Sequence, residues 1–301
     1  MINPSNQWEE FFSKKHTLSS KLLNNLGLPV LRTILTNSLI NFRRYKNCRP
    51  KDGFELELLK NGIITIPNFL PTNEFLDLKK EFSELISKKK NEDRNFKGVK
   101  STTIKYNEFE QFPSMKNLRD NKFLNRLICV GEGLRSLKIN SFLIENTRFG
   151  STKHQRQDPN NLFHADVHFH SHKVFYYMND ITEDHGPFTY LKGTHQNNLN
   201  RLLYEFKRAR LDNATEFAWR LENNLQNKFF KRYLNNLLKN KYKAIGRANT
   251  LIIGNVHGFH KVGDALEGNE RELIRITFRH NPIEVINKLT KPLRNFITQK
   301  N

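Results

Sequence analysis

The sequence is poor in cysteine and contains no long apolar run. Its two cysteines, Cys48 and Cys129, lie far apart and form no C-x-x-C pair. This excludes a disulfide framework and a thiolate metal site, and it favours a reducing compartment. No stretch approaches the ~20 apolar residues of a membrane span, and the first ten residues lack the basic start and apolar core of a secretory signal. We therefore expect a cytoplasmic protein without a membrane span.

Acidic residues are also scarce. The chain has 30 Asp and Glu against 50 Lys and Arg, a formal charge of +20. One interpretation is long-range attraction of an anionic partner such as nucleic acid, an acidic membrane surface or a phosphorylated substrate. The other is a compositional bias that leaves a basic, solvated surface. The second is favoured, because the basic residues are spread widely and no nucleic-acid motif accompanies them.

The apolar residues are few but well organised. They make up 37% of the chain and include 24 Phe, which gather with Leu and Ile into periodic segments that favour folding over disorder. We expect a single catalytic core at residues 51–284, preceded by a helical extension at 1–50 and followed by a tail at 285–301. The core should contain a helical insertion at 196–247.

The first fifty residues predict two helices. Ser5 or Asn6 could cap a helix that ends near Gly27. A second helix is expected from about Val30 to Tyr45, with one apolar face. The residues on that face are Leu31, Ile34, Leu35, Leu39 and Phe42. We expect this region to serve packing rather than chemistry.

Short strands dominate the rest of the chain. Helices are expected near Phe75–Ile86 and Phe123–Leu137, and exposed loops at Lys88–Lys100 and Ser151–Asn160. The predicted strands are Ile63–Ile66, Ile139–Phe149, Phe163–Val167, Val174–Met178, Phe188–Leu191, Thr250–Val256 and Arg271–Phe278. Helical spacing interrupts them from Leu199 to Lys243. The fold class is therefore mainly β with α decoration: a double-stranded β-helix, or jelly-roll and cupin-like core, with flanking helices.

The segment Phe163-His164-Ala165-Asp166 is the sharpest chemical feature. Residues i and i+2 of a strand point to the same face, so an imidazole and a carboxylate at this spacing can converge on one ion. A second histidine, His260, follows the strand Thr250–Val256. Two histidines and one carboxylate leave open positions that suit non-haem iron(II). Arg271 opens the next strand, where its guanidinium could grip the distal carboxylate of 2-oxoglutarate at two points.

From Phe54 to His280 the chain resembles the phytanoyl-CoA dioxygenase family. The matching segments occur in the family's order. They are Leu58–Leu70, His164-Ala165-Asp166, Tyr177–Pro187, Leu191–His195 where the family usually has Pro-Gly-Ser-His, and the separation from His260 to Arg271. The resemblance implies that His164, Asp166 and His260 hold iron and that Arg271 binds the cosubstrate.

The resemblance also implies a reaction. An Fe(II)- and 2-oxoglutarate-dependent dioxygenase would consume O2 and release succinate and CO2 while it oxidises a small organic substrate. Related halogenases have a small residue at the acid position, whereas this chain keeps Asp166, so hydroxylation or another oxidation is favoured. The protein's share is geometry, ligand orientation and exclusion of water.

Several residues compete for these roles. His257 is the rival of His260, which is favoured by its offset from Arg271. Arg275 and Arg279 share a strand face with Arg271, and Arg275 is its stronger rival. Three further histidines follow the ligand pair at every second position, so in a strand they would share its face. These are His168, His170 and His172, for which a polar loop is favoured over extra ligands.

The insertion leaves the substrate class open. It has twelve Lys or Arg against four Asp or Glu, which suits a lid that selects an anionic substrate, although a solvated amphipathic cover is favoured. The candidate contacts are Lys207, Arg208, Arg210, Lys231 and Arg232. Three functions remain: a small-molecule hydroxylase, an oxygenase acting on nucleic acid, and a catalytically silent binding protein on the same fold.

Overall fold

The structure is a computed structural model that describes residues 10–89, 94–96, 99–151, 155, 158–211, 220–284 and 286–287. The helices are α2 (Lys21–Asn25), α3 (Leu28–Asn47), α4 (Gly53–Asn61), α5 (Thr72–Lys88), α6 (Pro113–Arg119), α7 (Lys122–Glu132), α9 (Leu199–Ala209) and α10 (Lys228–Leu238), with 3-10 turns at Tyr106–Glu108, Pro159–Asn161 and Leu221–Asn224. The strands are β1 (Ile63–Ile66), β2 (Arg94–Phe96), β3 (Val99–Lys105), β4 (Ser141–Arg148), β5 (His172–Tyr177), β6 (Phe188–Leu191), β7 (Lys241–Lys243), β8 (Leu251–Asn255), β9 (His260–Val262) and β10 (Glu270–Phe278).

The strands form two antiparallel sheets. The larger has the order β1-β8-β5-β10-β4-β3-β2, and the smaller has the order β7-β6-β9. Strands distant in sequence are neighbours in the larger sheet, where β10 pairs with β4 on one side and β5 on the other. This arrangement confirms the jelly-roll core expected from the sequence.

Alternation along the central strands separates two environments. On β10, Ile274 and Ile276 belong to the core between the larger sheet and helices α4 to α7. The intervening Leu273 faces the smaller sheet, in a cluster with Tyr177 and Phe188. Successive side chains of a strand point to opposite faces, so alternate residues share a face. Arg271 and Arg275, two residues before and after Leu273, therefore lie with it on the face between the sheets. They line the same cavity there.

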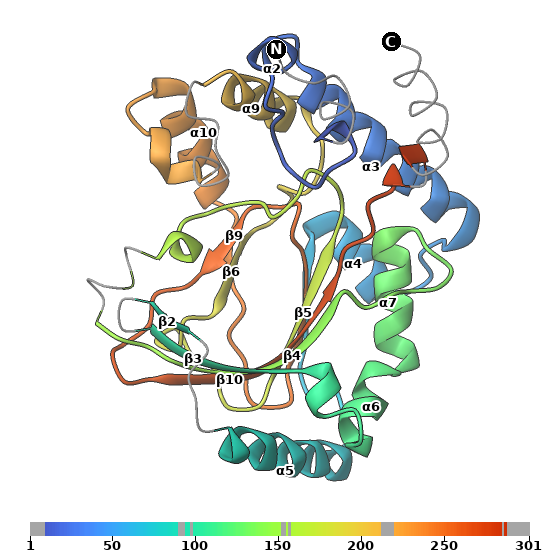
Figure 1. Cartoon of the computed structure of the whole chain (residues 1–301), viewed down its shortest axis with the longest axis vertical. Helices are drawn as coiled ribbons and strands as arrows, with labels where there is room; N and C mark the ends of the chain where they lie inside the picture. The colour runs from blue at the N-terminus through green and yellow to red at the C-terminus, as the bar shows by residue number, and fades with distance from the viewer. Residues whose placement is uncertain are drawn as a thin grey trace, which may run out of the picture.

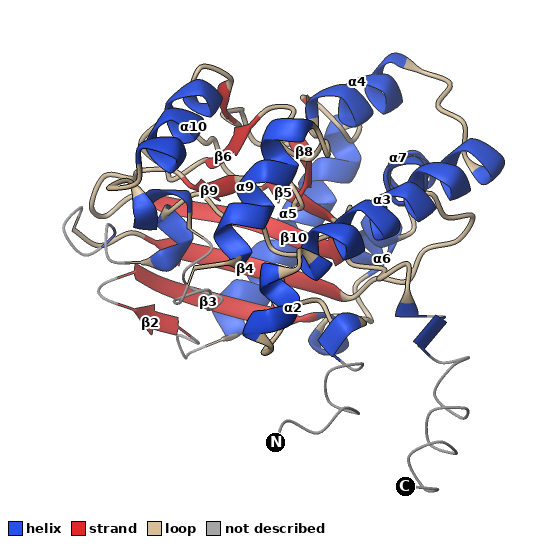
Figure 2. Cartoon of the chain, turned by 90° about the horizontal axis from the view of Figure 1, so that it is seen from above, coloured by secondary structure: helices blue, strands red, loops and turns tan. Residues whose placement is uncertain are grey.

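The helices cover the sheets on two sides (Figures 1 and 2). In Figure 1, α5 and α6 lie below the larger sheet, while α2, α3, α9 and α10 lie at the top, above the smaller sheet. None of the described helices is both long and apolar enough to cross a bilayer.

Most predicted strands are found close to their expected places. Phe188–Leu191 and Ile63–Ile66 are β6 and β1, and the predictions at 174–178, 250–256 and 271–278 correspond to β5, β8 and β10. These runs combine β-branched and aromatic residues with turn signals at their ends, which makes local sequence informative.

Several other predictions are wrong. The segment 163–167 is not a strand: only His164 makes an isolated bridge, to His260, and Asp166 lies in a bend. The expected loop 88–100 contains β2 and the start of β3, and α4 was not foreseen. Within the described part of 151–160, Gln155 is buried, because its amide donates to the carbonyls of Gly150 and Ala265.

The N-terminal region also differs from its prediction. Its first nine residues lie outside the described part, but from residue 10 to Asn25 the chain forms a short helical end, turns and α2 rather than one helix. Helix α3 is present, yet its apolar side faces solvent. Its buried residues are Pro29, Arg32, Thr33, Thr36, Asn37 and Ile40. The physical reason is that this mostly polar side hydrogen-bonds other segments: Asn37 bonds the backbone of His168 and His170, and Arg32 bonds carbonyls between residues 10 and 16.

Candidate metal centre and adjoining cavity

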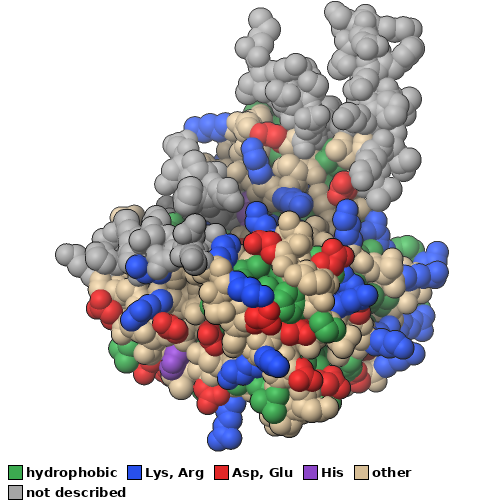
Figure 3. Space-filling model, turned by 60° about the horizontal axis from the view of Figure 1, so that its bottom comes forward, with side chains coloured by type: hydrophobic (Ala, Val, Ile, Leu, Met, Phe, Trp, Pro, Cys, Tyr) green, Lys and Arg blue, Asp and Glu red, His purple; other side chains and the backbone are tan. Residues whose placement is uncertain are grey.

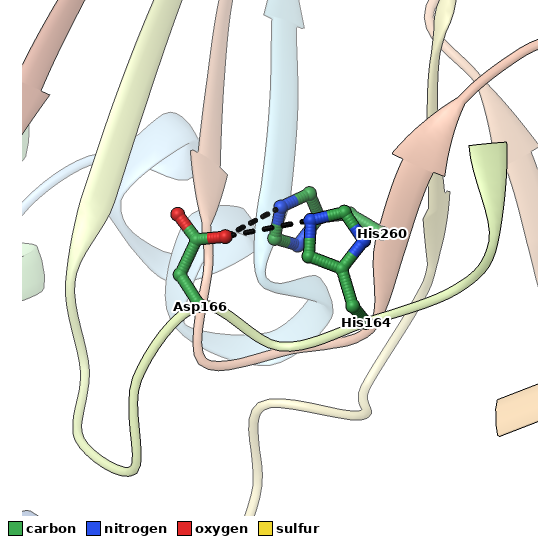
Figure 4. A group of neighbouring side chains, drawn as sticks. All are labelled: His164, Asp166 and His260. Carbon is green, nitrogen blue, oxygen red and sulfur yellow. Dashed lines mark ion pairs between the residues drawn. The ribbon is translucent and has the colours of Figure 1, made fainter. Parts of the chain in front are cut away.

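Three side chains that the sequence singled out converge on one point (Figure 4). Nε2 of His164 lies 3.5 Å from Oδ1 of Asp166, and Nε2 of His260 lies 3.4 Å from the same oxygen. The two imidazole rings are 4.4 Å apart at their centroids. Among the described residues, this is the one group of His, Cys, Asp or Glu side chains spaced to hold a metal ion.

Backbone pairing brings the distant histidine into place. The amide of His164 donates to the carbonyl of His260 and the reverse bond also forms, both at 2.9 Å. The amide of Asp166 donates to the carbonyl of Val256, also at 2.9 Å. The ligand segment is therefore attached to the chain around β9 at two points, although it forms no regular strand.

Hydrogen bonds orient both imidazoles toward the centre. Nδ1 of His164 lies 2.8 Å from the carbonyl of Leu162, and Nδ1 of His260 lies 3.0 Å from that of Gly258. A carbonyl can only accept, so each Nδ1 carries the proton and each Nε2 keeps a lone pair for a metal. Nε2 of His260 is buried and has no hydrogen-bond partner in the part of the chain that the structure describes, as expected for an atom whose partner is an ion.

The protonation states also suit a cation. Burial is the main reason that the pKa of His164 falls to about 4, so the ring is neutral at pH 7. Burial alone would raise the pKa of the Asp166 carboxyl, but the neighbouring Lys173 is the largest opposing cause, and that pKa lies well below its usual value. The centre thus presents a neutral His164 imidazole and a carboxylate.

The second oxygen of Asp166 is held by two cations. Nζ of Lys173 lies 2.7 Å and Nη2 of Arg279 lies 2.8 Å from Oδ2. These contacts leave Oδ1 to face the imidazoles and fix the plane of the carboxylate. Sequence reasoning named Arg279 only as a distant rival of Arg271, and it missed Lys173. Asp166 and Lys173 are separated by an odd number of positions, which in a strand would place them on opposite faces. The sequence therefore gave no sign that an irregular turn would bring them together.

A cavity of about 260 Å³ adjoins the centre and contains Arg271. The Arg271 side chain donates to the carbonyl of Gly186, and its guanidinium lies 5.3 Å from the centre of the Phe149 ring. Its Nε is buried and has no hydrogen-bond partner among the residues that the structure describes. Arg275 also lines the cavity but is paired with Glu145 at 2.6 Å. Arg279, just after β10, is paired with Asp166, so of Arg271, Arg275 and Arg279 only Arg271 forms no ion pair among the described residues.

The remaining histidines are buried away from the centre. His257 contacts the carbonyl of Val167 through Nδ1 and the amide side chains of Asn37 and Asn197 through Nε2. His168 and His170 lie in the expected loop and are buried, where their rings contact the carbonyl of Ser13 and the side chain of Asn255. The prediction is wrong for His172, which is the first residue of β5 and contacts Glu132 through Nδ1 at 3.0 Å. These rings therefore have structural partners instead of a metal-facing position.

Helix α3 supports the segment that carries these histidines. The Asn37 side chain accepts from the amide of His170 at 2.9 Å and donates to the carbonyl of His168 at 3.4 Å. Arg32 donates to four carbonyls between residues 10 and 16, and His16 contacts the carbonyl of Ala165 through Nε2 at 3.0 Å. Because this segment forms no regular strand, its backbone groups lack strand partners, and these contacts provide hydrogen bonds for some of them.

The insertion packs behind the ligands. Phe163, Ala165 and Phe259 share a buried cluster with Tyr204 of α9 and Phe230 of α10, so residues flanking the ligands contact the insertion while the ligands point the other way. The described part of 196–247 contributes no residue to the wall of the cavity. This described part supports the centre from outside.

The phytanoyl-CoA dioxygenase (PhyH) family matches residues 58–228. Among curated proteins, none matches the chain. Similar solved structures include the epimerase SnoN from nogalamycin biosynthesis with Fe3+, alpha-ketoglutarate and nogalamycin RO, at 11% identity over 75% of this chain and 81% of that chain with a TM-score of 0.48. Another is HygX from Streptomyces hygroscopicus with nickel and 2-oxoglutarate, at 14% identity over 73% and 83% with a TM-score of 0.48.

These structural likenesses are too distant to carry a residue's role to this chain. The family match contains His164 and Asp166 but ends before His260 and Arg271, so the case for those two residues comes from the geometry above. The match spans more than half of the 301 residues, and the chain belongs to the phytanoyl-CoA dioxygenase family of iron- and 2-oxoglutarate-dependent oxygenases.

Proposed function

We propose that the protein is an Fe(II)- and 2-oxoglutarate-dependent hydroxylase in which His164, Asp166 and His260 hold the iron. The observation that carries this proposal is the convergence of two Nε2 atoms on one carboxylate oxygen: Oδ1 of Asp166 lies 3.5 Å from Nε2 of His164 and 3.4 Å from Nε2 of His260. Both Nδ1 atoms are committed to carbonyls, so the donor set fits a divalent ion with open positions.

Arg271 would bind the distal carboxylate of 2-oxoglutarate. Its guanidinium lies in the cavity that His164 and His260 also line, and its Nε has no hydrogen-bond partner among the described residues. Phe149 and Tyr177 form apolar wall beside it, which strengthens a charge-assisted bond by excluding water. When bound, iron and 2-oxoglutarate supply the oxidising chemistry, in which O2 is consumed and succinate and CO2 are released.

The substrate would be small and polar. The outer wall of the cavity carries Ser101, Thr103, Thr147 and Asn160, which suit hydroxyl or amide groups. Most nearby cations are already paired with Asp166 or Glu145, which leaves Lys261 for an anionic group. An anionic substrate therefore has less support than a neutral polar one.

The other candidate functions gain no specific support. The nucleic-acid alternative rests on the charge of +20 alone. A silent binding protein would not need both histidine rings aimed at one carboxylate oxygen. We also propose the catalytic domain as residues 51–284, with the helical insertion at 196–247 and the extension at 1–50 attached through α3.

An anaerobic titration with Fe(II) and 2-oxoglutarate tests the assignment before any substrate is known. We expect the visible charge-transfer band of the chelate to form in the parent chain and to be lost in Asp166→Ala and His260→Ala. His185→Ala is the matched histidine control, because His185 contacts Thr182 in a turn outside the centre. The proposal fails if the folded parent binds no Fe(II), or if the His260 variant forms the same band as the parent.

A further inference from the structure

The exposed side of α3 is apolar, and Arg49 contacts it at Tyr45, 4.3 Å from the centre of the ring. Leu31, Leu35, Phe42 and Tyr45 lie along one side of this helix, within a stripe set by 3.6 residues per turn. Their exposed fractions are 58%, 40%, 63% and 66%. Apolar side chains of this size are rarely exposed in a continuous row without a binding role.

Two neighbouring helices also carry exposed leucines. Helix α3 contacts both α2 and α9, and α2 also contacts α9. Leu22 and Leu26 at α2 are 67% and 72% exposed, and Leu199 at the start of α9 is 72% exposed. The three helices lie together at the top of Figure 1 and face the viewer in Figure 2. We call this surface the α3 face: Leu22, Leu26, Leu31, Leu35, Phe42, Tyr45 and Leu199.

The three helices of the α3 face expose charges of one sign. Helices α2 and α3 contain no acidic residue, and the acidic residue of α9, Glu205, is buried and paired with Arg201. Exposed basic residues stand on the same helices, among them Lys21, Lys46 and Lys207. On the opposite side, acidic and basic side chains are interspersed over the surface (Figure 3).

We propose that the α3 face binds the surface of an anionic phospholipid membrane, with α3 lying flat in the headgroup region. A long apolar stripe with basic residues and no exposed acid is the pattern of an interfacial helix, since the apolar side chains enter the acyl boundary while Lys and Arg meet anionic headgroups. With 20 residues, α3 provides a contact about 30 Å long. A second copy fits less well, because each copy carries a charge of +20.

Membrane binding in this orientation leaves the catalytic cavity open. None of the residues that line the cavity comes from α2, α3 or α9. The polar side of α3 is at the same time bonded to the segment after Asp166 through Asn37. Docking at the membrane is therefore compatible with turnover and is a property separate from the proposed hydroxylation.

Vesicle co-sedimentation of the full chain tests the proposal. The probes are phosphatidylcholine vesicles with and without phosphatidylserine, at low and high salt. The variant Leu26→Ser/Leu31→Ser/Leu35→Ser removes part of the α3 face. The matched control is Leu56→Ser/Leu76→Ser/Leu266→Ser, because these leucines are 55%, 57% and 56% exposed at other places on the surface. All six positions are exposed, so both variants should melt at the temperature of the parent.

We expect the parent to bind phosphatidylserine vesicles, with weaker binding at high salt, and the α3-face variant to bind at least about tenfold more weakly. The control variant should bind like the parent. The proposal is overturned if no vesicle binding occurs, or if both variants lose binding equally. It is also overturned if the parent is a dimer that the α3-face variant dissociates, because a second copy then covers the surface.

Thiol labelling of Leu35→Cys gives an independent test. The native Cys48 is buried, and burial raises the pKa of Cys129 to about 11, so both should react slowly. The new thiol should label quickly in the free protein and slowly with phosphatidylserine vesicles. Slow labelling without vesicles would show that the chain itself covers this position, and it would contradict the proposal.

Discussion

Asp166→Asn should destabilise the protein even without metal. The substitution keeps the shape of the side chain but removes its charge, and Lys173 and Arg279 then remain near Oδ2 without a counter-charge. The Lys173, Arg279 and Asp166 side chains are 16%, 25% and 13% exposed. Removing one partner of a buried ion pair costs about 3–5 kcal/mol. Partial exposure of Arg279 places this site at the lower end, so we expect about 3 kcal/mol.

Urea unfolding in the presence of a chelator measures this effect. A loss of about 3 kcal/mol should lower the midpoint by roughly 1 M. Adding Lys173→Met should recover part of the loss, because one of the two unpaired cations is then gone, and a double-mutant cycle gives the coupling. Glu145→Gln, which leaves the more exposed Arg275 unpaired, should cost less. Equal stability of the parent and Asp166→Asn without metal would refute the reasoning.

Three further outcomes follow from the same contacts. Arg271→Lys should weaken 2-oxoglutarate binding at least about tenfold in the anaerobic titration, since a lysine cannot make the two-point contact, and should leave Fe(II) affinity within about twofold. Unchanged 2-oxoglutarate affinity would exclude Arg271 as the residue that binds its distal carboxylate. Asn37→Leu should lower the free energy of unfolding in urea by about 2–4 kcal/mol, because it leaves backbone groups of His168 and His170 without a hydrogen-bond partner. Asn41→Leu, at an exposed position of the same helix, should lower it by under about 1 kcal/mol. Stability should fall steeply with acid between about pH 6.5 and 4, because burial lowers the pKa of His16 and His195 to about 4. These rings take up protons only on unfolding in that window, so the stability present above pH 6.5 is lost as pH falls; a flat urea midpoint from pH 7 to 5 would contradict this.

The strands were predictable where local pattern and final environment agree. On β10, Ile274 and Ile276 alternate with Arg271 and Arg275, and the sheet separates them to a core face and a cavity face. The segment 163–167 misled the prediction, because its alternation is real but its backbone bonds are shared with His260 and Val256 rather than with a full strand. The alternation of residue types therefore predicted which side chains share a face, but it did not predict whether the segment forms a strand.

Helix α3 shows the limit of the hydrophobic pattern. Its stripe of Leu31, Leu35 and Phe42 defined an apolar side correctly, but a pattern does not say whether that side meets the core or solvent. The polar side was selected for burial because the irregular segment around His168 and His170 presents unpaired backbone groups that only donors and acceptors such as Asn37 can satisfy.

The sequence by itself determined the chemistry that was available: a His-x-Asp pair, a distant histidine and an arginine at a fixed offset from it, on a chain of short alternating strands. Only the tertiary structure decided how these groups meet. The bridge between His164 and His260, and the two cations that hold Asp166, are contacts between distant segments. They depend on which backbone and charged groups remain unsatisfied once the sheets have closed, and a local pattern carries no record of that.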